Sequence, residues 1–111
     1  MFEKNLELGY LLDFYGELLS ERKRTVMEMY YNEDFSLAEV AVEIGISRQG
    51  VRDIIKKSEE ELLFFEEKLG LAQKLKNVSQ KAAELKEIAS ELNLSQEFQE
   101  KLSKLISTVE K

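Results

Sequence analysis

The residues whose types and spacing could do chemistry lie in one short basic stretch. Between positions 47 and 57 the chain carries four cationic side chains against one carboxylate, a local charge of +3. Arginine can donate two hydrogen bonds to O6 and N7 of guanine, and glutamine can pair with the major-groove edge of adenine. The set therefore favours recognition of nucleic acid. Its members are Ser47, Arg48, Gln49, Arg52, Lys56 and Lys57.

Members of this set suit different parts of a nucleic acid. Arg48 and Gln49 are the candidates for reading bases, because they occupy the first turn of an expected helix. That turn enters the major groove in helix-turn-helix proteins. Ser47, at the start of the same helix, offers backbone amides and a hydroxyl to a phosphate. The other three cations would neutralise phosphates along the groove.

The same basic stretch has a second interpretation. Its side chains could form a solvated face that pairs with nearby glutamates, or a face that docks on a protein, as in many small helix-turn-helix units. The net charge of −6 counts against nucleic-acid binding by the molecule as a whole. However, the local field decides what one surface attracts. The sequence leaves both interpretations open.

A run of glutamates follows the basic stretch. Residues 58–68 hold five glutamates against Lys68, a local charge of −4. Such a run can suggest a divalent cation site, but ion-binding loops gather their ligands around a turn, and no turn is expected here. We therefore interpret the run as a solvated helix face and expect no metal site.

Two absences narrow the classes of function. The chain has no histidine and no cysteine, so it lacks the commonest catalytic base, the commonest transition-metal ligand and every Ser-His or Cys-His dyad. Catalysis would have to rest on carboxylates alone. We expect no catalytic residues and no cofactor, and a protein that is not an enzyme.

The composition also bears on location. A chain without cysteine suits the reducing cytoplasm. The segment from Met1 to Tyr10 mixes charges with its apolar residues, unlike a secretory signal. No apolar run approaches the roughly 20 residues that span a bilayer. We therefore expect a cytoplasmic protein without a membrane partner.

Helices must position the basic stretch. The chain has no proline and only five glycines, so little interrupts helix formation. Its apolar residues recur at spacings of three and four, and no segment shows the alternation typical of a strand. We expect an all-α protein of five or six helices.

The first two helices are expected within the first third of the chain. One begins near Leu8 and ends between Gly16 and Leu19. The other is capped by Ser20 and runs to about Tyr31. Their inward stripes are predicted to consist of Leu8, Leu11, Leu12, Tyr15, Leu18 and Leu19, and of Val26, Met27, Tyr30 and Tyr31.

The next two helices contain the basic stretch. A capping box of Ser36 and Glu39 starts the shorter helix, which stops at Gly45 because a glycine can take the left-handed conformation of a helix terminus. Ser47 caps the longer helix, which continues to Gly70. The predicted inward residues are Leu37, Val40, Ala41 and Ile44 in the shorter helix, and Val51, Ile54, Ile55, Leu62, Phe65 and Leu69 in the longer one.

Residues 37–57 have the spacings of a helix-turn-helix. Ala41 is small where two helices would cross closely, Gly45 makes the tight turn, and Ile46 fills the angle between the helices. Val40, Ile44, Val51 and Ile54 would fill the small core that holds the crossing. Because all of these offsets occur together with two good caps, the pattern is more specific than an ordinary pair of amphipathic helices.

The C-terminal part has a different periodicity. Apolar residues recur there at alternating spacings of four and three, the heptad pattern of a helix that packs against another helix. The pattern fits an antiparallel partner within the chain as well as a second copy. Its members are Leu71, Leu75, Val78, Ala82, Leu85, Ala89 and Leu92, and a last amphipathic helix is expected from Phe98, Leu102, Leu105 and Val109.

Several segments carry a resemblance to known families. Residues 18–24, 36–41 and 45–49 resemble region 4 of RNA polymerase sigma subunits. Residues 11–15, 29–39, 47–49 and 55–57 are similar to the YlxM family of small bacterial helix-turn-helix proteins. The second resemblance covers roughly residues 6–70. It implies a DNA-binding regulator whose gene commonly neighbours those of the signal recognition particle, with an accessory role in that pathway.

Taken together, the sequence predicts two parts and one main function. Residues 1–70 should form a sigma-region-4-like helix-turn-helix domain, and residues 71–111 a helical extension that dimerises the protein or packs on the first part. The expected homodimer interface comprises Leu71, Leu75, Val78, Leu85 and Leu92. Binding of duplex DNA in transcription regulation is the first hypothesis. The alternative is a protein- or RNA-binding accessory factor of the signal recognition particle without specific DNA binding.

Overall fold

A computed structural model describes residues 5–109 of the chain. Those residues form six α-helices and one 3-10 turn, and they include no strand. The protein is therefore all-α, as the sequence predicted. The chain divides into two compact units, with one ending at Gly70 and the other beginning at Leu71. The predicted absence of a secretory signal concerns residues 1–10, the first four of which lie outside the described residues.

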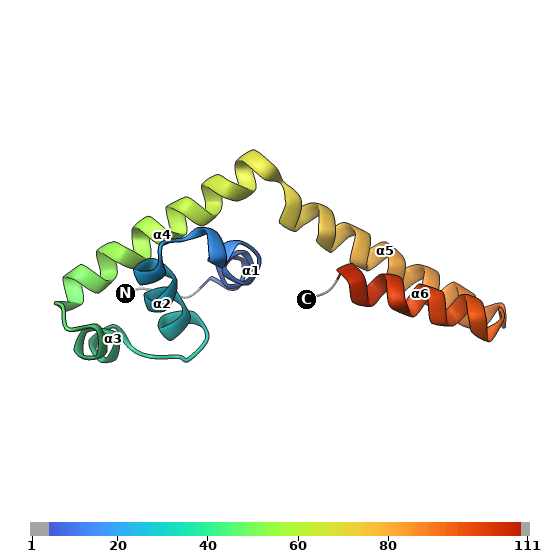
Figure 1. The fold of residues 1–111 in the computed structure, drawn as a ribbon, viewed down its shortest axis with the longest axis horizontal. Helices are drawn as coiled ribbons and strands as arrows, with labels where there is room; N and C mark the ends of the chain where they lie inside the picture. Colours follow the sequence, from blue (N-terminus) through green and yellow to red (C-terminus); the bar gives the residue numbers. More distant parts are fainter. Residues whose placement is uncertain (1–4, 110–111) are drawn as a thin grey trace. The chain divides into compact units, whose positions relative to one another are not determined.

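The N-terminal unit is built around one long helix. The three shorter helices all pack against α4 and lie along one side of it (Figure 1). The elements are α1 (Leu6–Tyr15), the 3-10 turn η1 (Gly16–Leu18), α2 (Glu21–Tyr31), α3 (Leu37–Ile44) and α4 (Arg48–Leu69).

Side-chain caps begin these helices where the sequence predicted them. The hydroxyls of Ser20, Ser36 and Ser47 accept hydrogen bonds from backbone amides three residues later. At Ser36 the capping box is complete, because the carboxylate of Glu39 also accepts from the amide of Ser36 at 2.8 Å. These bonds favour the ionised carboxyl and hold the pKa of Glu39 below its usual value.

The core of the unit lies between α4 and the shorter helices. Its fully buried side chains come from α2, α3 and α4, and almost all are apolar. Burial of such side chains is the main stabilising contribution to a small domain. They are Val26, Met27, Val40, Val51, Ile55, Ser58 and Leu62.

Two residues of the predicted inward stripes are exposed. Leu18 is 59% exposed, and Leu69 is 50% exposed. Leu18 leaves its stripe because α1 ends at Tyr15 and the chain tightens into η1, which changes the rotation per residue. Leu69 keeps its helical position, but periodicity predicts only the direction of a side chain. It does not predict whether another element extends far enough to cover it.

The C-terminal unit is a helical hairpin. Helices α5 (Leu71–Glu91) and α6 (Gln96–Val109) run antiparallel and pack side by side (Figure 1). The turn between them includes Asn93, whose φ of 52° lies in the left-handed region. Ala82, Ala89 and Leu102 are buried. The small alanines let the two helices approach closely.

The seven predicted heptad positions do not form one seam. Ala82 and Ala89 are buried in the hairpin, and Leu75 is half-buried. The others, Leu71, Val78, Leu85 and Leu92, are exposed in this single chain. An intrachain partner therefore covers only part of the predicted line, because α6 packs on a stripe rotated from it.

Within residues 5–109, none of the helices is both long and apolar enough to cross a bilayer.

We predict opposite effects for two glycine-to-alanine substitutions. Gly45 has a φ of 82°, so Gly45→Ala should destabilise the N-terminal unit by roughly 1–2 kcal/mol. Gly9 lies inside α1, and a Cβ there would meet Tyr31 at an ordinary 3.6 Å. Gly9→Ala should therefore stabilise by roughly 0.5–1 kcal/mol.

Urea unfolding followed by tyrosine fluorescence measures both glycine effects. All four tyrosines precede residue 32, so this signal reports on the N-terminal unit alone. Equal midpoints for the two variants would contradict the left-handed turn at Gly45.

Candidate nucleic-acid interface

The basic stretch lies on the second helix of a helix-turn-helix. Helix α3 ends at Gly45, where the amides of Gly45 and Ile46 both donate to the carbonyl of Ala41. Two residues later Ser47 caps α4. This short connection holds α3 against the start of α4, and the two helices pack together. The turn therefore presents the first turn of α4 at the surface.

The first turn of α4 carries the two predicted base-reading residues. Ser47, Arg48 and Gln49 are all exposed. The Ser47 hydroxyl accepts from the amide of Gly50 at 3.0 Å. Because a helix start leaves its first amides without intrahelical acceptors, the remaining amides of this turn, those of Arg48 and Gln49, can still donate to an anion.

Gln49 is held by Asp53, which is not one of the six predicted site residues. Its Nε2 donates to Oδ1 of Asp53 at 3.0 Å. The second amide hydrogen and Oε1 of Gln49 stay available, and these are the groups that pair with adenine. Asp53 therefore orients the glutamine. The spacing of four residues along a helix, which places side chains next to each other, could have revealed this pair.

Arg52 extends the surface toward α3. Arg48, Gln49 and Arg52 line one shallow hollow of about 340 Å³ together with Leu37, the first residue of α3. Three of the six predicted residues thus share one opening with the start of α3. In helix-turn-helix complexes the first helix lies across the DNA backbone, so this arrangement fits that geometry.

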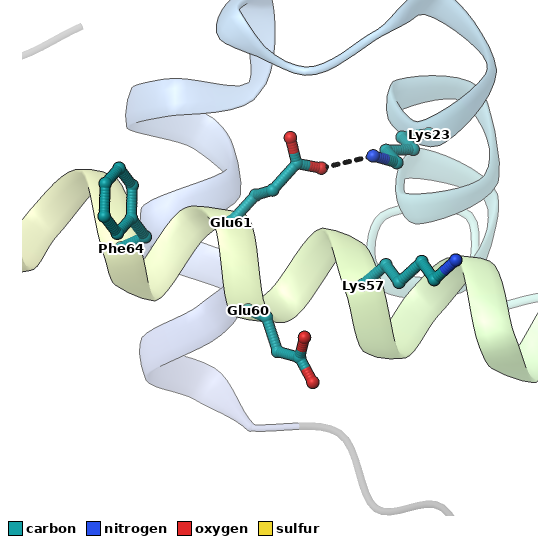
Figure 2. A pocket seen from close by; sticks show the side chains of 5 residues that line it. All are labelled: Lys23, Lys57, Glu60, Glu61 and Phe64. Carbon is teal, nitrogen blue, oxygen red and sulfur yellow. Dashed lines mark hydrogen bonds and ion pairs between the residues drawn. The ribbon is translucent and has the colours of Figure 1, made fainter.

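Lys56 and Lys57 are both exposed, but Lys57 lies on another side of α4. Five residues separate it from Arg52, which corresponds to about 140° around a helix. Lys57 lines a second hollow of about 310 Å³ with Lys23, Glu60, Glu61 and Phe64 (Figure 2). The six residues therefore do not form a single patch. Arg52 lies on the same side of α4 as Arg48 and Gln49, whereas Lys57 lies on another side.

The glutamate run behind the basic stretch is not uniformly solvated. Glu61 reaches from α4 to Lys23 of α2 at 2.6 Å, as Figure 2 shows. Glu59 accepts from the hydroxyl of Tyr31, and Glu66 accepts from the hydroxyl of Tyr15 at 2.6 Å. Glu60 and Glu67 are exposed. Three of the five glutamates thus tie α4 to α1 and α2, which corrects the interpretation of the run as one solvated face.

The contact between Tyr31 and Glu59 also affects ionisation. Burial of the phenol, followed by its hydrogen bond to the Glu59 carboxylate, raises the pKa of Tyr31 well above its usual value. The phenol therefore stays neutral and continues to donate. Within residues 5–109, no group of three or more acidic side chains is placed to hold a metal ion.

Comparison with known proteins agrees with this geometry. The model of the UPF0122 family, described as "Putative helix-turn-helix protein, YlxM / p13 like", matches residues 2–107. A UPF0122 protein of Bacillus cereus strain AH187 is 40% identical over 111 residues, which is all of this chain and 98% of the relative. UPF0122 proteins of Bacillus anthracis strain A0248 and Bacillus thuringiensis subsp. konkukian strain 97-27 match to the same extent.

The chain belongs to the UPF0122 family. The resemblance to YlxM proteins that the sequence suggested is thereby confirmed. Its extent was underestimated, because the match covers the C-terminal hairpin as well as residues 6–70. The hairpin is therefore part of what this family shares.

Proposed function

We propose that this protein binds duplex DNA sequence-selectively as a gene regulator, with α4 in the major groove. One observation carries the proposal. The exposed first turn of a helix-turn-helix second helix presents Arg48 and an oriented Gln49. Both residue types read base edges in a major groove.

The distribution of charge supports the same proposal. Three glutamates of α4 are engaged with α1 and α2, which keeps their carboxylates away from the first turns of the helix. At about 100° per residue, Arg52 and Lys56 lie on the same side of α4 as Arg48 and Gln49, so their cations can reach phosphates beside the bases that this side would read. Lys57, on another side of the helix, is left for the phosphate backbone.

Selection from a random duplex pool tests this proposal most directly. The full chain should enrich one sequence class, and fluorescence anisotropy should then show tighter binding to the selected duplex than to a scrambled one. We expect binding to weaken steeply between 50 and 200 mM salt, because counterions are released from the phosphates. Pools without enrichment, or equal affinity for the selected and scrambled duplexes, would overturn the proposal.

The acidic net charge of −6 favours a second candidate, an accessory factor of the signal recognition particle that binds its protein or its RNA. Such a factor would work in the cytoplasm, which also suits a chain without cysteine. The particle RNA serves as a parallel bait in the anisotropy measurement. Saturable binding to that RNA together with indifference to every duplex would replace the DNA proposal with this one.

A further inference from the structure

The C-terminal hairpin has an apolar surface that its own two helices leave uncovered. On α5 the side chains of Val78, Leu85, Ile88 and Leu92 are between 44% and 65% exposed. On α6 those of Phe98 and Leu105 are nearly half exposed. Monomeric proteins rarely expose a contiguous apolar area of more than a few hundred Å². This surface therefore calls for a partner.

Helical geometry places these residues on one face of the hairpin. With about 100° per residue, the exposed stripe of each helix lies roughly 85° from its buried stripe, in the same rotational sense. The buried positions that define the contact line include Ala82 and Ala89 on α5 and Leu102 on α6. Because the two helices run in opposite directions, equal rotations bring both stripes to the same side. We refer to this side as the apolar face.

The opposite face of the hairpin is polar. By the same rotation it carries Lys76, Ala83 and Glu87 from α5, and Glu100 and Ser107 from α6, all of them exposed. A hairpin that stood alone in water would need no such difference between its two sides. The asymmetry is that of one half of a four-helix bundle.

We infer that a second copy of the chain covers the apolar face, so that two hairpins form a four-helix bundle. The 21 residues of α5 span about 30 Å, and two helices side by side are about 20 Å wide. With the shorter α6, the flat footprint is on the order of 500 Å² per copy. Because side chains project from the helices, the accessible surface that is buried exceeds this flat area and approaches the roughly 800 Å² per partner of a stable interface.

The charges at the rim of the apolar face suit a two-fold pair. Glu84 lies at the outer edge of α5, and Lys101 and Lys104 lie at the outer edge of α6. Glu84 is nine positions before Asn93, whereas the two lysines are eight and eleven positions after it, so all three are nearly level along the hairpin. A two-fold axis parallel to the helices sets α5 of one copy over α6 of the other. Glu84 of each copy then meets the lysines of its partner.

Two charged residues, Lys74 and Lys81, lie within the stripe of α5 itself and are exposed. Their long aliphatic stems can cover apolar side chains while their ammonium groups reach water at the rim. Compared with the interface expected from the sequence, this face keeps Val78, Leu85 and Leu92. It omits Leu71 and the half-buried Leu75, and it gains Ile88 of α5 together with Phe98 and Leu105 of α6.

Sedimentation equilibrium of the full chain at tens of micromolar tests the inference. The parent should have twice the chain mass of 12.9 kDa. Leu85→Glu places a charge in the middle of the apolar face and should yield a monomer, since a buried unpaired charge is strongly unfavourable. Ala83→Glu makes an equal change on the polar face and should leave the dimer intact. Circular dichroism at the same concentration shows whether both variants keep their helix content.

Reversing charges at the rim tests whether a second copy of the chain covers the apolar face. Glu84→Lys alone should raise the dimer dissociation constant severalfold, and Glu84→Lys combined with Lys101→Glu should restore it, because the two charges meet only across copies. A monomeric parent, or reversals without effect on the dissociation constant, would overturn the inference. These measurements use no nucleic acid, so they can fail or succeed independently of the proposed DNA binding.

Discussion

Replacing Ile55 with alanine should lower the free energy of unfolding of the N-terminal unit by about 2–5 kcal/mol. Ile55 is fully buried on the side of α4 that faces the shorter helices. Truncation removes most of an apolar side chain and leaves a cavity that close-packed neighbours cannot fill. Because small domains are stable by only about 5–15 kcal/mol, this loss would threaten the helix-turn-helix itself.

A neighbouring residue provides the matched control for Ile55→Ala. Ser58 is also fully buried on α4, but its hydroxyl donates only to the carbonyl of Ile54, at 2.7 Å within the same helix. Ser58→Ala removes one polar atom, opens almost no cavity and improves helix propensity. We expect a change within about 1 kcal/mol. Urea titration with tyrosine fluorescence compares the two, and similar losses in both would show that burial on this face does not dominate stability.

Replacing Arg48 with alanine should weaken binding to the selected duplex about 5- to 150-fold, equivalent to roughly 1–3 kcal/mol. The loss should be confined to duplexes that keep the base pair which Arg48 reads, so preference at that position should relax. Arg48 is exposed, so the substitution should leave the fold unchanged. Anisotropy on duplexes that differ at single base pairs measures this effect.

Lys57→Ala is the comparison for Arg48→Ala. Lys57 is exposed nine residues after Arg48, away from the first turn that would read bases, so its expected partner is a phosphate. It lines the hollow with Lys23, Glu60, Glu61 and Phe64 (Figure 2). Its loss should weaken all duplexes about equally and reduce the slope of log affinity against log salt by about one unit. If both variants lost affinity uniformly across sequences, direct reading of bases by Arg48 would be excluded.

Local sequence signals predicted the helices and the turn well. The serines at 20, 36 and 47 cap helices, and the glycines at 45 and 70 end them with positive φ, as their chemistry requires. Caps and glycine turns involve residues within a few positions of one another, so neighbours in sequence decide them. The same locality explains why the all-α class and the helix-turn-helix could be predicted without tertiary information.

The partners of charged residues could not be predicted in this way. The glutamates at 59, 61 and 66 look alike in sequence to those at 60 and 67, yet only the first three bind side chains of α1 and α2. Which carboxylate meets a tyrosine or a lysine depends on where α1 and α2 lie against α4. That placement follows from packing between distant segments.

From the sequence alone, therefore, one could determine the helices, their caps, the turn at Gly45 and the exposed basic residues of α4. Only the tertiary structure decided that Arg48, Gln49 and Arg52 share a hollow with Leu37 of α3 while Lys57 shares one with Lys23 of α2, and that Ala82 and Ala89 face α6 while Leu85 remains exposed. The physical reason is that helical periodicity specifies the direction of a side chain around its own axis. What that side chain meets is set by the position of another helix, and packing of the whole core determines that position.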